Sequence, residues 1–197
     1  MPDASGQRSP GPFIAVVGPS GAGKDTILAL ARPQLGKDTR FARRVITRLS
    51  QIEAEDHDSL DDAAFDTAER AGAFCLSWAA HGLRYGLPAD LVSHCEAGHA
   101  VVANVSRRAL EPAALRFSPL HVVEISAPRA LLVTRIAARG RESAEEIEKR
   151  LARSVVLDIP EGAFGPHRID NSGKADDAAA DFVRLVRSLV EDASAAA

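Results

Sequence analysis

The chain has 197 residues, of which 46% are apolar and 26% are charged, and its formal net charge is −3. This length suits one ordinary domain, and this composition excludes a disordered or membrane-embedded class of protein. The charge gives no global positive field, so we expect neither nucleic acid nor a membrane as a partner. The apolar run at 13–17 is too short for a signal sequence, so the cytoplasm is the expected location.

The first residues favour a loose end followed by a buried strand. Residues 1–12 (MPDASGQRSPGP) are rich in Pro, Gly and Ser, so we expect a disordered tail before a single domain over 13–197. Phe13 to Val17 is a continuous apolar run, typical of a buried parallel strand. A glycine-rich turn and a helix from about Lys24, interrupted at Pro33, are expected next.

The segment over about 41–86 differs from the rest in having several short strand patterns. A strand is predicted over 41–48, and a half-buried strand over 74–79. Between them, residues 53–66 contain seven acidic residues and lead into a helix that reaches Arg70. We interpret this segment as an inserted lobe.

The second half alternates helices with strands. Strand patterns occur at 100–105, 121–126 and 168–170. Helices are expected to begin at Pro88, at Pro128 and at the capping box of Ser143 and Glu146. One apolar face marks a last helix, at Phe182, Leu185, Val186, Leu189 and Val190. This alternation predicts a three-layer α/β fold with a mainly parallel sheet.

The stretch GPSGAGKDT follows the first strand and opens the first helix, which is the context of a phosphate-binding loop. Successive backbone N–H groups in such a loop form an anion site, and its lysine reaches the β- and γ-phosphates. The residues expected to hold the nucleotide are Gly18, Pro19, Ser20, Gly21, Ala22, Gly23, Lys24, Asp25 and Thr26.

Two positions depart from the usual magnesium site of such loops. Asp25 stands where a Ser or Thr usually supplies a hydroxyl, and Asn104 stands where many phosphate-loop enzymes have an acidic metal ligand. Asp25 could be a helix-start acid, which is worth about 0.3–1 kcal/mol. We favour a carboxylate in the outer shell of a Mg²⁺ ion that substrate oxygens and water mostly hold.

Four arginines gather around an interruption between two helices over about 135–152. They are Arg135, Arg139, Arg141 and Arg150. Such a group can close as a lid over a triphosphate and neutralise charge on the transferred phosphoryl group. The alternative is a solvated helical hairpin in which Glu145, Glu146 and Glu148 pair with the arginines.

Three segments together resemble the guanylate kinase family: GPSGAGKDT, FCLSWAAHGLRYG and RGRESAEEIEKRL. The resemblance covers roughly residues 13–190, and implies a P-loop NTPase fold with an acceptor-binding lobe and a helical lid. Guanylate kinases read guanine with a Glu at the position of Ser77. With Ser77 in place of that carboxylate, the N–H donors of guanine would have no acceptor at this position. Each unpaired donor costs about 1–3 kcal/mol, so Ser77 argues against GMP as the acceptor.

A closer resemblance is to the ribose 1,5-bisphosphate phosphokinase family. It lies in GKDT, RRVITR (43–48), EDH (55–57), LSWAAHGLRYGLP (76–88) and VVANVSR (101–107). It implies that ATP phosphorylates the 1-phosphate of ribose 1,5-bisphosphate, giving 5-phosphoribosyl 1-diphosphate and ADP. The alternatives are a guanylate or other nucleoside monophosphate kinase and a non-catalytic binding module. The intact Lys24 and the lid arginines argue against the binding module.

A phosphate acceptor is already an anionic nucleophile, so the site needs alignment and positive charge rather than a general base. The resemblance implies that Arg44, Arg48 and Tyr85 grip phosphate. Arg84 and His81 are candidates for a second phosphate. The remaining substrate candidates are Asp56, His57, Ser77 and Asn104, although His57 could be structural and Asp56 could belong to a solvated acidic loop.

The expected roles can be stated by group. The catalytic residues are Lys24, Arg135, Arg139 and Arg150. Arg141 joins the nucleotide site, and so does Asn171, which lies near the place where relatives bind adenine. The expected cofactors are ATP and Mg²⁺, and the expected partner is a small-molecule substrate. The oligomeric state stays open between a monomer and a homodimer.

Overall fold

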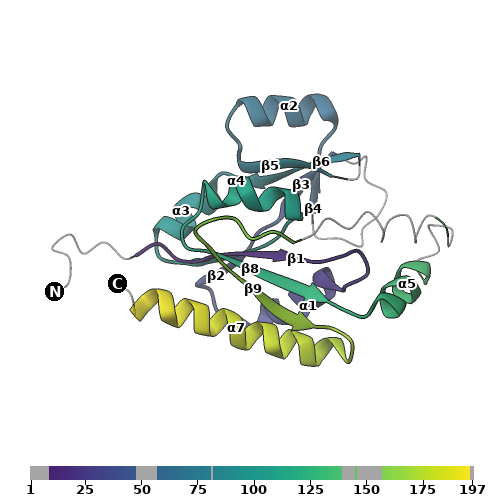
Figure 1. Ribbon diagram of the computed structural model, residues 1–197. Helices are drawn as coiled ribbons and strands as arrows, with labels where there is room; N and C mark the ends of the chain where they lie inside the picture. The colour runs from purple at the N-terminus through teal and green to yellow at the C-terminus, as the bar shows by residue number, and fades with distance from the viewer. Residues whose placement is uncertain (1–8, 48–56, 81, 139–144, 146–156, 196–197) are drawn as a thin grey trace.

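A five-stranded parallel sheet forms the centre of the computed structural model, which describes residues 9–47, 57–80, 82–138, 145 and 157–195 (Figure 1). Its strands, in spatial order, are β2 (Thr39–Phe41), β7 (Ala100–Asn104), β1 (Phe13–Val17), β8 (Leu120–Ser126) and β9 (Ala163–Asp170). All neighbouring pairs are parallel. The carboxyl ends of β1, β7 and β8 therefore meet at one edge, where ligands bind in folds of this kind.

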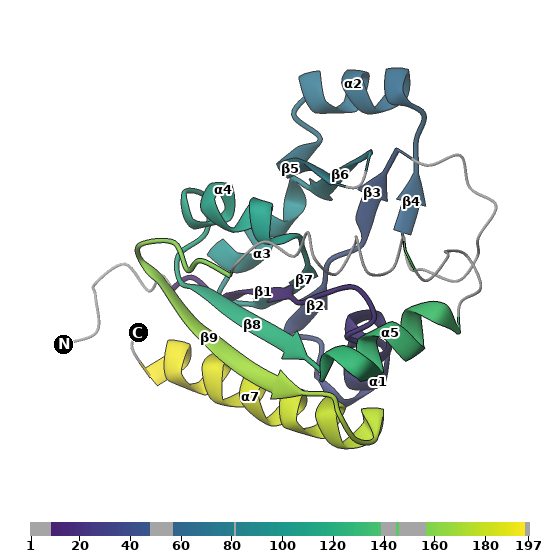
Figure 2. The same ribbon diagram turned by 45° about the vertical axis from the view of Figure 1, so that its right-hand side comes forward.

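Both faces of the sheet are covered, which explains why β1 is apolar at every position. All five of its residues have an exposed fraction of 0%. On one face, Ile14 and Val16 pack with residues of α1 (Lys24–Ala31), α5 (Arg129–Ala137) and α7 (Ala175–Ala195). On the other, Phe13, Ala15 and Val17 pack with residues of α3 (Asp90–Glu96) and α4 (Leu110–Ala114). Figures 1 and 2 show these layers.

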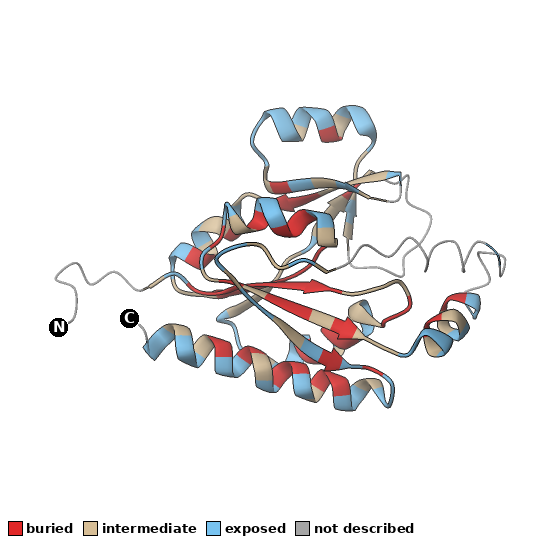
Figure 3. Ribbon diagram, viewed as in Figure 1, coloured by how far each residue is buried: buried red, intermediate tan, exposed pale blue. Residues whose placement is uncertain are grey.

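The predicted α/β fold with a mainly parallel sheet is therefore confirmed. The predicted apolar face of the last helix is confirmed too, since Phe182, Val186 and Leu189 are buried. Figure 3 shows this burial on the side of α7 that faces the sheet. In the part of the chain that the structure describes, no helix is long and apolar enough to cross a membrane.

A second sheet lies beside the first, with the strand order β4 (His57–Ser59), β3 (Arg44–Ile46), β6 (Leu83–Pro88) and β5 (Phe74–Ala80). The helix α2 (Asp62–Arg70) covers it, and Phe65 of α2 packs on Phe74 with ring centroids 4.8 Å apart. Asp61 caps α2, because its Oδ1 accepts a hydrogen bond from the Ala64 N–H at 2.7 Å. This sheet spans much of the predicted lobe; its acceptor-binding role stays a prediction.

The structure differs from the predicted elements in three places. The single strand expected over 41–48 is two strands, because β2 pairs with the central sheet and β3 with the second sheet. The strands β4 and β6 were not predicted. Pro88 ends β6 opposite Phe74 instead of opening a helix, and α3 begins at Asp90. A proline lacks the N–H of a ladder, and the end of a strand tolerates that loss.

Two histidines are paired on β8 and β9, at the edge of the central sheet. His121 Nδ1 and His167 Nε2 are 3.4 Å apart, and the Phe164 ring stacks on His121 at 5.0 Å. Burial lowers the pKa of both histidines, and the charge of His167 lowers the pKa of His121 further, while Asp192 opposes that shift. Each pKa therefore lies below the value of about 6.5 expected in the unfolded chain.

We predict a loss of stability in acid from this pair. A lowered pKa means that the unfolded chain binds more protons, so the contribution is fully present above about pH 6.5 and is lost as the pH falls through the folded pKa. Thermal midpoints between about pH 5 and pH 8 test this. A His121→Asn/His167→Asn variant should have a flatter profile than the wild type, and His99→Asn is the control. Equal profiles for all three proteins would contradict the prediction.

Candidate active site

The phosphate loop joins β1 to α1 and has the backbone that its glycines permit. Gly21 and Gly23 have φ angles of 81° and 85°. A Cβ on Gly21 would lie 3.0 Å from Leu132 O of α5, and one on Gly23 would lie 2.4 Å from Asn171 Nδ2. Gly23 is the N-cap of α1 and supplies no side-chain cap. The helix start can therefore offer its first N–H groups to a phosphate.

Lys24 folds back over this loop. Its Nζ donates hydrogen bonds to Gly18 O at 2.7 Å and to Pro19 O at 3.1 Å. The ammonium group is thus held above the loop, at the place from which the lysine of such loops reaches the β- and γ-phosphates. The structure brings Lys24 and the loop together as a nucleotide site requires.

Asp25, Asn104 and Arg44 form a polar chain beside the loop. Asn104 Nδ2 donates to Asp25 Oδ1 at 2.6 Å, and Arg44 NH2 lies 3.7 Å from the same oxygen. The Asp25 side chain is 55% exposed, whereas Asn104 is buried. An accessible carboxylate that a buried amide orients fits the oxygen chemistry of Mg²⁺. Among the described residues no cluster of three or more His, Cys, Asp or Glu could hold a metal.

One face of the second sheet carries the acceptor candidates. The registers of β3, β4, β5 and β6 place Arg44, His57, Tyr85 and Trp78 on the same face. The Arg44 guanidinium lies 5.9 Å from the centroid of the Tyr85 ring, which stacks on Trp78 at 5.3 Å. Trp78 also packs against the core. His57 Nδ1 is buried and has no hydrogen-bond partner among the described residues.

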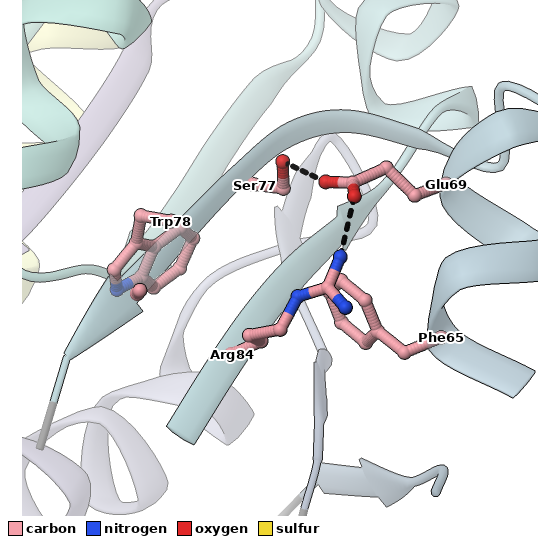
Figure 4. A pocket seen from close by; sticks show the side chains of 6 residues that line it. Phe65, Glu69, Ser77, Trp78 and Arg84 are labelled. Carbon is pink, nitrogen blue, oxygen red and sulfur yellow. Dashed lines mark hydrogen bonds and ion pairs between the residues drawn. The ribbon is translucent and has the colours of Figure 1, made fainter. Parts of the chain in front are cut away.

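Ser77 and Arg84 lie on the opposite face of this sheet, toward α2 (Figure 4). Ser77 Oγ donates to Glu69 Oε1 at 2.5 Å, and Arg84 pairs with Asp66 and Glu69. The hydrogen bond from Arg84 holds the pKa of Asp66 below its usual value. Glu69, Ser77 and Arg84 line a cavity of about 180 Å³ that Trp78 also borders. The structure therefore does not bring Ser77 and Arg84 together with Arg44 and Tyr85.

Asn171 supports the phosphate loop from behind. It follows β9 with an exposed fraction of 2%, and its Nδ2 donates to Ala22 O at 2.8 Å. Its backbone N–H donates to Ser126 O at 2.8 Å, which ties the loop to the end of β8. The structure thus gives Asn171 a bracing contact, and its contact with adenine stays a prediction.

Six of the predicted site residues lie outside the described residues. They are Arg48, Asp56, His81, Arg139, Arg141 and Arg150. Of the lid arginines, the structure describes Arg135, in the last turn of α5. Its NH1 atom is buried and has no hydrogen-bond partner among the described residues. Because α5 packs against Gly21, Arg135 belongs to a helix that borders the phosphate loop.

Sequence reasoning missed one ion pair at the carboxyl edge of the central sheet. Arg107 NH2 lies 3.1 Å from Glu124 Oε1, and both side chains are largely buried. The signal was present, because Glu124 is an acid within a predicted strand that is otherwise largely apolar. A buried carboxylate needs a partner of opposite charge. That partner is Arg107, which lies in the segment VVANVSR and to which the sequence analysis gave no role.

Comparison with known proteins identifies the family. No family model matches the sequence. The chain is 52% identical over 166 residues to ribose 1,5-bisphosphate phosphokinase PhnN of Brucella melitensis biotype 2, which covers 83% of this chain and 85% of that protein. It is 44% identical over 177 residues to the protein of the same name from Agrobacterium fabrum, with coverages of 89% and 96%. The chain belongs to the ribose 1,5-bisphosphate phosphokinase family.

Solved structures agree on the fold. The guanylate kinase of Anaplasma phagocytophilum superposes with a TM-score of 0.65 over 92% of this chain and 87% of that one, at 15% identity. That identity shows a shared fold alone. The ribose 1,5-bisphosphate phosphokinase family therefore uses the guanylate kinase fold here, and both predicted resemblances and the prediction of a kinase are confirmed.

We predict that Asn171→Ala weakens nucleotide binding. The substitution removes the donor to Ala22 O and leaves a buried carbonyl unpaired, at a cost of about 1–3 kcal/mol. Each 1.4 kcal/mol is tenfold in affinity, so the Kd for ATP should rise about 5- to 150-fold. Calorimetric titration with ATP measures this. The control is Ser172→Ala at the exposed next position, and an unchanged Kd for Asn171→Ala would contradict the bracing role.

Proposed function

We propose that this protein transfers the γ-phosphoryl group of ATP to the 1-phosphate of ribose 1,5-bisphosphate and releases 5-phosphoribosyl 1-diphosphate and ADP. Membership of the family, with relatives named as ribose 1,5-bisphosphate phosphokinases, supports the substrate. The geometric observation that carries the proposal is the position of Arg44. Its guanidinium lies between Asp25, beside the phosphate loop, and Tyr85, on the lobe. A cation there can hold an acceptor phosphate next to a bound triphosphate.

The reaction needs charge and alignment from the chain. An oxygen of the 1-phosphate forms a bond to the γ-phosphorus as the bond from that phosphorus to the bridging oxygen of ADP breaks, and the electron pair leaves with ADP. Arg44 and Tyr85 orient the attacking phosphate, and Lys24 neutralises charge on the β- and γ-phosphates. Arg135 would add a donor from the α5 side. Mg²⁺, when bound, neutralises phosphate charge, and Asp25 would orient its water shell.

The acceptor face favours a sugar phosphate over GMP. The position at which guanylate kinases carry a Glu is Ser77, which lies on the opposite face of the sheet and donates its hydroxyl to Glu69 of α2, so this position supplies no carboxylate to the acceptor face. On the face of Arg44 and Tyr85, the described polar candidate is His57, whose buried Nδ1 has no hydrogen-bond partner among the described residues. A ribose hydroxyl could donate to this nitrogen or accept from it. We also propose a cytoplasmic location, because the relatives are bacterial metabolic enzymes.

We predict that the purified protein releases ADP with ribose 1,5-bisphosphate and not with GMP. A coupled assay of ADP release compares the two acceptors at equal concentration, and the diphosphate product is identified by its mass. Lys24→Ala should lose most of this activity while it keeps its fold, because the substitution removes the ammonium group from the phosphate loop. Turnover of GMP without turnover of the sugar bisphosphate would overturn the proposed function.

We predict that Asp25→Asn raises the Mg²⁺ concentration needed for half-maximal rate more than it raises the Kd for ATP. The asparagine keeps the size of the side chain and an oxygen that can accept the hydrogen bond from Asn104 Nδ2, but it loses the charge that attracts the metal. The control is Asp176→Asn, which removes an acid from the first turn of α7, far from the loop in sequence. If Asp25 is a helix-start charge alone, both variants will lose stability and neither will change the Mg²⁺ titration.

A further inference from the structure

We propose that a cavity at the outer edge of β2 is a second anion site, which binds the diphosphate group of a small molecule. This site is separate from the phosphate loop, and its existence does not depend on the proposed function. The cavity has a volume of about 340 Å³ and is lined by Arg32, Lys37, Thr39, Arg40, Phe41 and His94. Three of these side chains are permanently cationic, and none of them is acidic.

The cavity lies at the opposite edge of the central sheet from the phosphate loop. The loop follows the carboxyl end of β1, whereas Thr39 opens β2 and is in register with Ala100, the first residue of β7. The helix α1 begins at Lys24, and Arg32 follows its last residue. A helix of this length spans about 12 Å, so the loop and the cavity lie at the two ends of α1.

Elements on both faces of the sheet contribute to the cavity, because β2 is the outermost strand. Successive side chains of a strand point to opposite faces. Phe41 packs with the core on the side of α1, and the Arg32 guanidinium lies 5.4 Å from the centroid of its ring. Arg40 points to the other face and pairs with Asp90 of α3 at 2.7 Å, and His94 lies one turn further along α3. The cavity therefore extends around the edge of β2.

Lys37 contributes a positive charge that no carboxylate of the described residues neutralises. It lies in the turn before β2, is exposed and forms no ion pair with the described residues. Arg32 and Arg40 have contacts within the protein that hold their guanidinium groups in place. The Asp90 side chain that pairs with Arg40 is 59% exposed, so water screens this pair. Neither arginine needs to be without a partner for the cavity to attract an anion.

These side chains suit a diphosphate better than a single phosphate or a carboxylate. The volume of about 340 Å³ lies within the range of small-molecule sites, about 300–1,000 Å³, and exceeds what one phosphate needs. Arginine offers a planar fork of donors to phosphate oxygens, and lysine adds a point charge. A chain of two phosphates can contact cations from separate segments at the same time. Both products of the proposed reaction carry such a group, and so does inorganic pyrophosphate.

The alternative role of these cations is to stabilise the ends of helices. Arg32 is the C-cap of α1, and His94 lies in the last turn of α3. Cations at the C-terminal end of a helix stabilise its dipole. Lys37 and Arg40 belong to neither helix, so this role leaves both of them unexplained.

Calorimetric titration with inorganic pyrophosphate tests the site. It is made without Mg²⁺, so that the diphosphate keeps its full charge. The wild type should bind pyrophosphate at two sites, the phosphate loop and the cavity. Lys24→Ala should weaken the first site alone. Lys37→Glu should weaken the second site alone and raise its Kd about 10-fold or more, because it removes a charged donor and adds a repelling charge.

The matched control is Arg116→Glu, which makes the same change in net charge at an exposed position outside the cavity. It should leave both Kd values within about twofold of the wild type, since exposed charges at a distance are screened. Lys37→Arg keeps the charge and should retain the second site.

His94 gives a second readout, because it lines the cavity. Burial lowers the pKa of His94, and the charges of His99 and Arg40 lower it further, while Asp90 and Asp38 oppose that shift. A diphosphate in the cavity adds negative charge and should raise the pKa of His94. The ring signals of His94, followed by NMR during a pH titration with and without pyrophosphate, measure this change.

The outcomes are separable. A single pyrophosphate site that Lys24→Ala weakens would overturn the assignment. A second site that Lys37→Glu and Arg116→Glu weaken equally would overturn it too, because net charge alone would then explain the binding. So would a Lys37→Glu variant that loses stability and keeps the second site, as a role at a helix end requires.

Further titrations identify the source of the diphosphate. Tighter binding of ADP than of pyrophosphate at the second site would assign it to a nucleotide, and tighter binding of 5-phosphoribosyl 1-diphosphate would assign it to a sugar; either result supports the site. All these experiments measure binding alone. Their outcome is therefore independent of whether the protein phosphorylates ribose 1,5-bisphosphate.

Discussion

The hydrogen bond between Asn104 and Asp25 is the contact on which the candidate site depends. It joins the end of β7 to the first turn of α1, and through Arg44 it reaches the first strand of the lobe. Related enzymes place a hydroxyl on the loop and a carboxylate on the strand. Here the carboxylate of Asp25 is on the loop and the neutral amide of Asn104 is on the strand. The junction therefore carries one negative charge, and Arg44 of the lobe lies next to it.

The two faces of the lobe sheet carry arginines in different charge environments. One face carries Arg44, Tyr85 and His57, of which Arg44 lies beside Asp25, and the other presents Arg84 and Ser77 to the carboxylates of α2. Arg84 pairs with two carboxylates of α2, whereas Arg44 lies next to a single carboxylate oxygen, which also accepts the hydrogen bond from Asn104. The alternation of side chains along a strand thus decides which arginine faces α2 and which lies near the phosphate loop.

The sequence was sufficient where the chemistry is local. The loop from Gly18 to Thr26, the buried strand before it and the family follow from contiguous residues. The prediction was wrong for 41–48, because strands of three residues are too short to show a period and the chain changes sheets between them. The face of Phe74 depends on the irregular register between Phe74 and Leu76, and the pair of Arg107 and Glu124 depends on tertiary packing, so neither could be read from spacing.

The position of β9 has a consequence for how the protein behaves at high concentration. It is the outermost strand of the central sheet, and at eight residues it is a long edge that another chain could pair with. Pro166 lies within it, and the pairing with β8 is irregular between His121 and Val123. A proline and a bulge both interrupt a regular row of backbone donors and acceptors. The proline and the bulge in β9 thus disfavour pairing of this edge with the edge of a second chain, which would lead to aggregation.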